Sequence, residues 1–232
     1  MTNKKWLSIS EDEKDITVIE EKTDEWGSIT SKKCEFIKSE TGDFHKITIT
    51  YSMKGLWELE KEIADNKFSQ IEIPDGGLML DDPGSPQLPQ EGLFIALPDN
   101  YDELEISVVE TESKVYKLKS DLIPVPKPTR DATLIVEKGE IYDKDEFYPG
   151  VLYKNFGVNK IGNVKTLHLM IYPVQYNPKA QTIEVYSKIV LEIKYKEKED
   201  ETSKKFRGYP VKKRKKRVPR MFRDSLLNLE NI

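Results

Sequence analysis

The main candidates for a nucleophile and a general base in this chain are three residues: the single cysteine, Cys34, and the two histidines, His45 and His168. A cysteine nucleophile needs a neighbouring base, so Cys34 would have to pair with one of these histidines. Cys34 lies in KKCEFIK, a pattern typical of a strand, in which a lone cysteine usually packs as a small apolar residue. His168 alternates with Leu167 and Leu169, as a residue on a strand surface does. We therefore predict no catalytic residues.

Ligands for a metal or a cofactor are also few. Asp81 and Asp82 follow Gly76 and Gly77 and suit a turn, because the regular ligand spacing of a calcium loop is absent. A single cysteine excludes both an intrachain disulfide and a cysteine-rich zinc site. The sequence has no phosphate-binding loop, no dinucleotide-binding glycine pattern and no G-x-S-x-G elbow. We expect no cofactor, no metal and no enzymatic activity.

The densest charge lies near the C-terminus. Residues 204–223 contain eleven Lys and Arg and no Asp or Glu, although the net charge of the chain is −4. Three interpretations are open: a solvated flexible end, a nucleic-acid-binding patch, or a peptidase-sensitive segment. Nucleic-acid binding usually adds a recognition helix or stacking aromatics, and the aromatics here are scattered.

Arg217, Arg220 and Arg223 lie in this basic segment. An Arg-specific peptidase requires such side chains in an exposed, poorly structured chain. These three arginines are therefore the candidate processing sites.

The elements that must position these residues are mostly strands. A chain of 232 residues with 37% apolar residues can bury one large all-β core or two small ones. Apolar residues occupy most odd positions from Ile183 to Tyr195, which predicts a long strand. Residues 164–174 predict a second strand, and Asn177-Pro178 predicts the turn that joins the two as a hairpin. Eight shorter strand-like segments precede them: DITVIE, CEFIK, FHKITITY, SQIEI, GLFIALP, LEISVVE, KVYKLK and ATLIVEKG.

Three other segments interrupt this pattern. Residues 55–66, GLWELEKEIADN, place Leu56, Leu59, Ile63 and Ala64 near one face and predict one short helix, with a loop that covers the core edge with Trp57 as the alternative. Residues 70–89 end in GSPQLP, which predicts a stiff extended connector, because proline fixes φ and removes a backbone donor. Residues 121–132 contain three prolines in five positions and predict a polyproline-like linker that crosses between sheets.

No stretch reaches the roughly 18 consecutive apolar residues of a membrane span. The opening MTNKKWLSISEDEKD lacks the apolar core of a secretory signal. From the residues alone we expect a soluble chain without a signal peptide.

The order of several motifs resembles the N-terminal propeptide of gingipain-type cysteine peptidases. The motifs are IEIPDGG, GSPQLP, GLFIALP, IPVPKP, FYPG and PVQYNP, the last running into the long strand, and together they span about residues 44–196. GSPQLP and PVQYNP are the most specific of them. The resemblance implies an all-β fold, an antiparallel, jelly-roll-like β-sandwich. It also implies a non-catalytic domain that assists the folding of a cysteine peptidase domain, keeps it latent, and is secreted or extracytoplasmic.

The resemblance also implies roles for particular residues. Family propeptides are removed by cleavage after basic residues, which here would be Arg217, Arg220 and Arg223. In the family a loop places a basic side chain in the specificity pocket of the peptidase. The candidates for that side chain are Arg130, Lys154 and Lys160, which lie in loop-like stretches, and no motif chooses among them.

We expect three parts: an N-terminal extension with early strands at 1–43, the propeptide-like β-sandwich at 44–196, and a flexible basic tail at 197–232. The expected partner is the catalytic domain of a gingipain-like cysteine peptidase. The first alternative is a β-sandwich binding or adhesion module that recognises a glycan or protein through Trp26 or Trp57. A weaker alternative is nucleic-acid binding through the basic tail. No membrane contact is expected.

Overall fold

The computed structural model describes residues 4–9, 30–38, 44–74, 77–80, 82–131, 133–198, 217–222 and 226–228. Its strands are β1 (Lys4–Ser8), β2 (Thr30–Lys38), β3 (Phe44–Met53), β4 (Gly55–Ile63), β5 (Asn66–Glu72), β6 (Leu78–Met79), β7 (Pro89–Leu97), β8 (Tyr101–Lys117), β9 (Lys127–Pro128), β10 (Leu134–Ile135), β11 (Tyr153–Ile161), β12 (Val164–Ile171), β13 (Val174–Asn177) and β14 (Thr182–Glu197). Two short 3-10 turns complete the described elements, η1 (Glu140–Asp143) and η3 (Arg220–Phe222).

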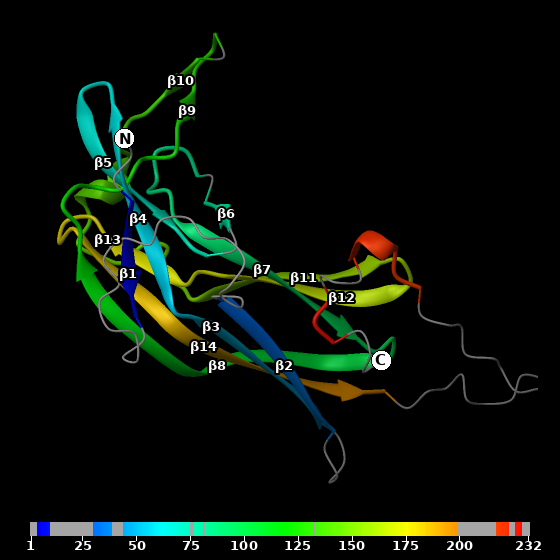
Figure 1. Ribbon diagram of the computed structural model, residues 1–232. Helices are drawn as coiled ribbons and strands as arrows, with labels where there is room; N and C mark the ends of the chain where they lie inside the picture. Colours follow the sequence, from blue (N-terminus) through cyan, green and yellow to red (C-terminus); the bar gives the residue numbers. More distant parts are fainter. Residues whose placement is uncertain are drawn as a thin grey trace, which may run out of the picture.

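Two antiparallel sheets form a sandwich (Figure 1). One has the order β13-β14-β3-β2, with β8 paired along β14, and the other has the order β11-β12-β7-β6. A smaller sheet, β1-β4-β5, and the two-stranded ribbon β9-β10 lie at one end. The prediction of an all-β antiparallel sandwich is confirmed.

The core lies between the two sheets and follows the alternation of each strand. In β3 every second residue is buried, and Ile47 and Ile49 are fully inaccessible. Leu93 and Ile95 of β7 belong to the same apolar cluster. The alternation predicted for 183–195 is confirmed, since the odd positions are buried except the partly buried Ser187. One buried face per strand therefore fixes the register of both sheets.

The predicted hairpin between 164–174 and 183–195 is only partly correct. β12 pairs with β11 and β7 in the opposite sheet, and only β13 pairs with β14. The chain changes sheet at Tyr172-Pro173, where proline has no N–H to continue the β12 ladder. The turn chemistry at Asn177-Pro178 thus serves the short hairpin β13-β14.

The predicted helix at 55–66 is wrong. These residues form β4 and a tight turn into β5, and β4 also pairs with β1. The spacing of Leu56 and Leu59 suits a helix, but two neighbouring strands satisfy the β4 backbone, and tertiary pairing overrides such weak local preferences. Ala64 and Asp65 in the turn have φ of 47° and 63°.

We expect Ala64→Gly to stabilise the chain by about 1 kcal/mol, because an L side chain in the left-handed region costs about that much and glycine does not pay it. Urea unfolding followed by circular dichroism measures the change. Ala180→Gly is the matched control: Ala180 is exposed in a turn without positive φ, so its replacement should destabilise the chain slightly.

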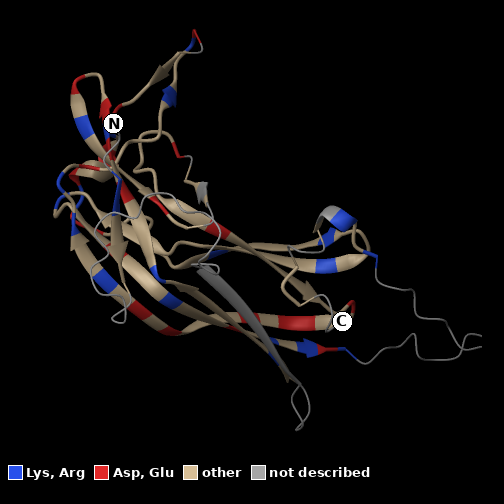
Figure 2. Ribbon diagram, viewed as in Figure 1, with Lys and Arg blue, Asp and Glu red and all other residues tan. Residues whose placement is uncertain are grey.

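Strand β8 pairs only with β14 within the described part of the chain. Acidic residues recur along it (Figure 2). They are Asp102, Glu103, Glu105, Glu110 and Glu112. Charges on an edge strand oppose pairing with another chain, so these acids protect the sheet edge from aggregation.

Candidate functional site

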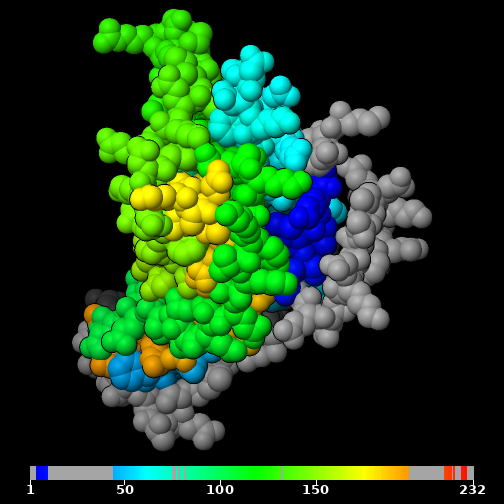
Figure 3. Space-filling view, turned by 90° about the vertical axis from the view of Figure 1, so that its left-hand side faces the viewer, coloured from blue at the N-terminus to red at the C-terminus, as the bar shows by residue number. Residues whose placement is uncertain are grey.

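The β9-β10 ribbon projects from one end of the sandwich (Figure 1). We call residues 126–137 the arm. In the space-filling view the arm and the β4-β5 hairpin form the upper end of the molecule (Figure 3). Arg130 lies in the turn between β9 and β10 and is exposed. Of the three basic candidates, Arg130 is therefore the one at the tip of a projection.

The tip of the arm is closed by hydrogen bonds. The Thr129 N–H donates to the Thr133 carbonyl at 2.9 Å. Asp131 accepts hydrogen bonds from the hydroxyls of Thr129 and Thr133. These bonds hold the pKa of Asp131 below its usual value. The carboxylate therefore turns into the tip and Arg130 remains exposed.

The stem of the arm pairs with the GSPQLP segment, residues 84–89. The Gly84 N–H donates to the Val125 carbonyl at 2.8 Å, and the Val125 N–H donates to the Ser85 carbonyl at 2.7 Å. The returning side of the stem is tied by the Gly139 N–H, which donates to the Gly84 carbonyl at 2.8 Å. Gly84 has a φ of 83°, and a Cβ there would lie 2.5 Å from the Lys127 side chain. The positive φ therefore favours glycine at this position, whereas the Lys127 side chain could move away from a Cβ.

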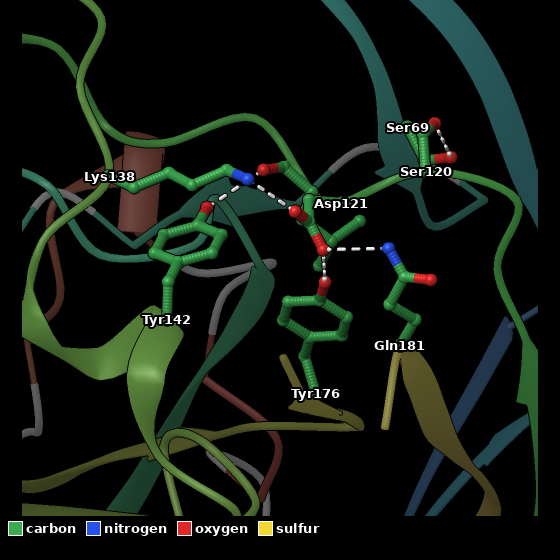
Figure 4. A network of polar contacts seen from close by, with 8 residues as sticks. Ser69, Ser120, Asp121, Lys138, Tyr142, Tyr176 and Gln181 are labelled. Carbon is green, nitrogen blue, oxygen red and sulfur yellow. Dashed lines mark hydrogen bonds and ion pairs between the residues drawn. The ribbon is translucent and has the colours of Figure 1, made fainter. Parts of the chain in front are cut away.

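Asp121 is the centre of a polar network at the base of the arm (Figure 4). It pairs with Lys138 and accepts hydrogen bonds from the Tyr176 hydroxyl at 2.9 Å and the Gln181 amide at 3.2 Å. Tyr142 donates from its hydroxyl to the Leu122 carbonyl at 2.8 Å. Because Asp121 precedes the arm and Lys138 follows it, the ion pair closes the stem from both sides.

The electrostatics of this network favour an ionised carboxylate. Partial burial alone raises the pKa of Asp121, but hydrogen bonds from Lys138, Tyr176 and Gln181 outweigh it, and the resulting pKa lies below 3.8. Burial raises the pKa of the Tyr142 and Tyr176 hydroxyls, so both stay protonated and act as donors. Asp121 is therefore a stable anion at neutral pH that holds the arm by charge and hydrogen bonds.

The resemblance motifs, which are far apart in the sequence, meet around this base. GSPQLP pairs with IPVPKP through the isolated bridge of Pro86 with Pro124. FYPG meets PVQYNP through the bridge of Tyr148 with Tyr176, and the Tyr148 hydroxyl donates to Asp82 at 3.1 Å. Residues 121–128 of the predicted linker are thus the first side of the stem; they pair with GSPQLP and with β10 instead of crossing between the two sheets, and Arg130 and Asp131 form the turn at the tip.

Lys154 and Lys160 do not lie in loops, so that part of the prediction is wrong. Both belong to β11, where Lys154 is paired with Met170 and Lys160 with Lys165. The Lys154 ammonium lies 5.2 Å from the centre of the Phe156 ring. Both side chains are exposed on the sheet.

The candidate processing sites differ in their placement. Arg217 and Arg220 are exposed and lie in the C-terminal segment that returns to the sandwich, and Arg220 begins η3. Arg223 lies outside the described residues, as does Asp81.

The cysteine and histidines are not brought together. In the β2-β3 ladder Cys34 lies opposite Ile49 and Lys38 lies opposite His45, four residues further along. Four residues of strand correspond to about 13 Å. His168 is in the other sheet, stacked on Phe94 with ring centres 4.6 Å apart. Within the described residues no group of His, Cys, Asp and Glu is arranged to hold a metal ion.

The aromatic platform required by the adhesion alternative is not formed by Trp57. Its ring packs edge-on against Trp6 with centres 4.8 Å apart, and the Lys4 ammonium covers it at 4.7 Å. Trp26 lies outside the described residues. No helix in the described part of the chain is long and apolar enough to cross a membrane.

Reasoning from the sequence did not single out four residues of the network at the base of the arm: Asp121, Lys138, Tyr142 and Gln181. Tyr176 lay within PVQYNP, and Asp121 immediately preceded the proline-rich segment, so the motifs marked the region. The pairing of Asp121 with Lys138 had no signal in the sequence, because the two residues are 17 positions apart and the whole arm lies between them.

Comparisons with known proteins agree with this architecture. A family model described as Propeptide_C25 matches residues 33–225. A structure of the pro- and mature domains of Porphyromonas gingivalis RgpB in complex is similar with a TM-score of 0.61 at 16% identity, covering 86% of this chain and 98% of that chain. A structure from work on the zymogenic latency of gingipain K from Porphyromonas gingivalis has a TM-score of 0.58 at 20% identity, covering 75% and 96%. At these identities the likeness establishes a shared fold. No curated protein matches the chain.

Proposed function

This chain belongs to the Propeptide_C25 family as a non-catalytic, gingipain-type propeptide region, and we propose that it inhibits a cysteine peptidase domain and assists its folding. The observation that carries this proposal is the arm, which presents Arg130 at its tip from a base fixed by the Asp121 network. The peptidase domain is proposed to be the partner in an extracytoplasmic or secreted setting.

Three features of the arm support an inhibitory contact through Arg130. An inhibitor needs a rigid scaffold and a segment that enters the substrate cleft, since preorganisation lowers the entropic cost of binding. The stem hydrogen bonds and the Asp121–Lys138 pair supply the rigidity. Leu134 and Ile135 of β10 are 68% and 42% exposed, which provides apolar surface beside Arg130 for a partner to cover.

The proposed contact places the Arg130 guanidinium in the pocket that recognises the basic residue of a substrate. A planar guanidinium binds a carboxylate through two parallel hydrogen bonds, which a lysine does not reproduce. The hydrogen bonds of Thr129, Asp131 and Thr133 beside Arg130 restrict the chain there, which lowers the entropic cost of binding. The expected target is therefore an Arg-specific peptidase of the gingipain type.

The test is an inhibition assay with purified full chain against an Arg-specific and a Lys-specific gingipain-type peptidase, each with a fluorogenic substrate. We expect inhibition of the Arg-specific enzyme at or below micromolar concentration and weaker inhibition of the other. Absence of inhibition of both enzymes at micromolar concentration contradicts the proposal. The folding role is measured separately, as the yield of active peptidase refolded with and without the chain.

We further propose that the chain is removed by cleavage after basic residues of the segment 204–223, with Arg217, Arg220 and Arg223 as candidates. The concentration of eleven basic residues there supports this proposal. Mass spectrometry of the products formed by the same Arg-specific peptidase identifies the bonds that are cut.

A further inference from the structure

Residues 217–222 and 226–228 return to the β11-β12-β7 sheet beyond the basic run (Figure 1). Val218 and Leu226 are each 6% exposed and form a second apolar cluster with Ala96 and Val164. The prediction placed these residues in a flexible tail, whereas the described ones contact the sheet. Two buried apolar side chains distinguish this docked segment from a solvated tail.

Asn228 completes the open edge of β7. It is 2% exposed, its side-chain oxygen accepts from the Ala96 N–H at 2.7 Å, and its side-chain nitrogen donates to the Ala96 carbonyl at 3.0 Å. Beside it the Leu227 N–H donates to the Phe94 carbonyl at 3.1 Å. These bonds occupy the backbone groups of β7 as an added strand would.

Arg217 is held at the other end of the docked segment by the β11-β12 turn. Its N–H donates to the Asn163 side-chain oxygen, and its carbonyl accepts from the Asn163 N–H at 3.1 Å. Gly162 in the same turn has a φ of 65°, and a Cβ there would lie 2.1 Å from the Arg217 carbonyl oxygen. Both backbone groups of Arg217 are therefore engaged, and the glycine leaves room for them.

Arg220 is also in a conformation that a peptidase does not accept directly. It begins η3, in which the Phe222 N–H donates to the Pro219 carbonyl at 2.9 Å. Peptidases bind the chain around a scissile bond in extended form, pairing with its backbone as with a strand. A helical turn at Arg220 and occupied backbone groups at Arg217 both oppose that pairing.

We propose that docking of residues 217–222 and 226–228 closes the Arg217–Val218 bond to peptidases, so that Asn163 and Asn228 decide when this bond is cut. Hydrolysis adds OH from water to the Arg217 carbonyl carbon and H to the Val218 nitrogen as the bond between them breaks. For this, Val218 must leave its apolar cluster and Arg217 must leave Asn163. Cleavage after Arg217 therefore follows undocking, although the arginine side chain is exposed throughout. The inference is independent of the proposed inhibitory function.

Limited proteolysis of the full chain with trypsin tests this inference. The measured quantity is the rate at which the fragment beginning at Val218 appears, followed by mass spectrometry. We expect Asn228→Ala to increase this rate about tenfold or more, because Ala96 loses both hydrogen bonds and the docked state is weakened. Asn163→Ala should increase it in the same direction. Asn159→Ala, an exposed asparagine on β11, is the matched control and should leave it unchanged.

Two further measurements keep the result decisive. Circular dichroism must show that the Asn228→Ala variant retains the wild-type fold. If the variant does not fold, hydrogen exchange of the wild-type chain is measured in place of the cleavage rate of the variant. In that experiment the amides of Arg217 and Leu227 are expected to be protected, and exchange at the rate of an unstructured peptide overturns the inference. Equal cleavage rates at Arg217 in wild type and in a folded Asn228→Ala chain also overturn it. Because trypsin replaces the partner peptidase, neither outcome bears on inhibition.

Discussion

Replacing Arg130 by alanine is expected to raise the inhibition constant against an Arg-specific gingipain-type peptidase by about 100-fold or more, the loss typical of a central arginine in an interface. The tip of the arm would then carry no cation for the specificity pocket. Stability should not change, because Arg130 is exposed and no hydrogen bond from its side chain supports the fold within the described residues. The inhibition constant and the urea midpoint are measured on the same preparations.

Two sets of variants make this prediction specific. Lys154→Ala and Lys160→Ala remove exposed basic side chains from β11 and should leave the inhibition constant within about twofold. Arg130→Lys should shift preference toward a Lys-specific peptidase, because a lysine does not reproduce the two-pronged contact of a guanidinium. An unchanged constant for Arg130→Ala, with a large loss for Lys154→Ala, would move the inhibitory contact from the arm to the sheet.

Replacing Asp121 by alanine is expected to lower the free energy of unfolding by about 2–4 kcal/mol, because a partly buried ion pair and two hydrogen bonds are lost together. Tyr176, which is fully buried, would be left with a hydroxyl whose acceptor is gone. The two sides of the stem would also lose their direct link, so inhibition should weaken about tenfold even though Arg130 is retained. Urea unfolding and the inhibition constant measure the two effects.

Asp102→Ala is the matched control for Asp121→Ala. Asp102 pairs with Lys198 at 3.3 Å, and both side chains are well exposed. An exposed pair of this kind contributes about 0–1 kcal/mol. If Asp121→Ala lowers the free energy of unfolding no more than Asp102→Ala does, the network at the base of the arm does not stabilise the fold as proposed.

The pKa of Asp121 also predicts a pH dependence. The carboxyl group has a pKa below 3.8 in the folded chain, so near pH 4 the unfolded chain binds a proton more readily than the folded chain. Its contribution to stability is therefore complete above that region and is lost as the pH falls through the folded pKa. Asp121→Asn removes this contribution, so the difference in stability between wild type and variant should shrink below about pH 4. A difference that is constant from pH 7 to pH 3 contradicts the assignment.

Local patterns in the sequence determined the strands and the family. Alternation at 183–195 predicted a long strand with one buried face, because a strand exposes its two faces in turn and only one faces the core. The proline-rich motifs fixed extended segments, since proline restricts its own φ and the residue before it whatever surrounds them. The same local logic failed at 55–66, where the leucine spacing suited a helix and pairing with β1 and β5 decided otherwise.

The tertiary structure alone decided which basic residue stands on the arm and which arginine is held against the sheet. Asp121 meets Lys138, and Ala96 meets Asn228 across 132 residues of chain, through contacts that no local pattern records. Such contacts depend on how the sheets pack, and packing is a property of the whole chain. The sequence by itself therefore identified the propeptide and its candidate residues, while the fold separated Arg130 on a projection from Lys154 and Lys160 on a strand.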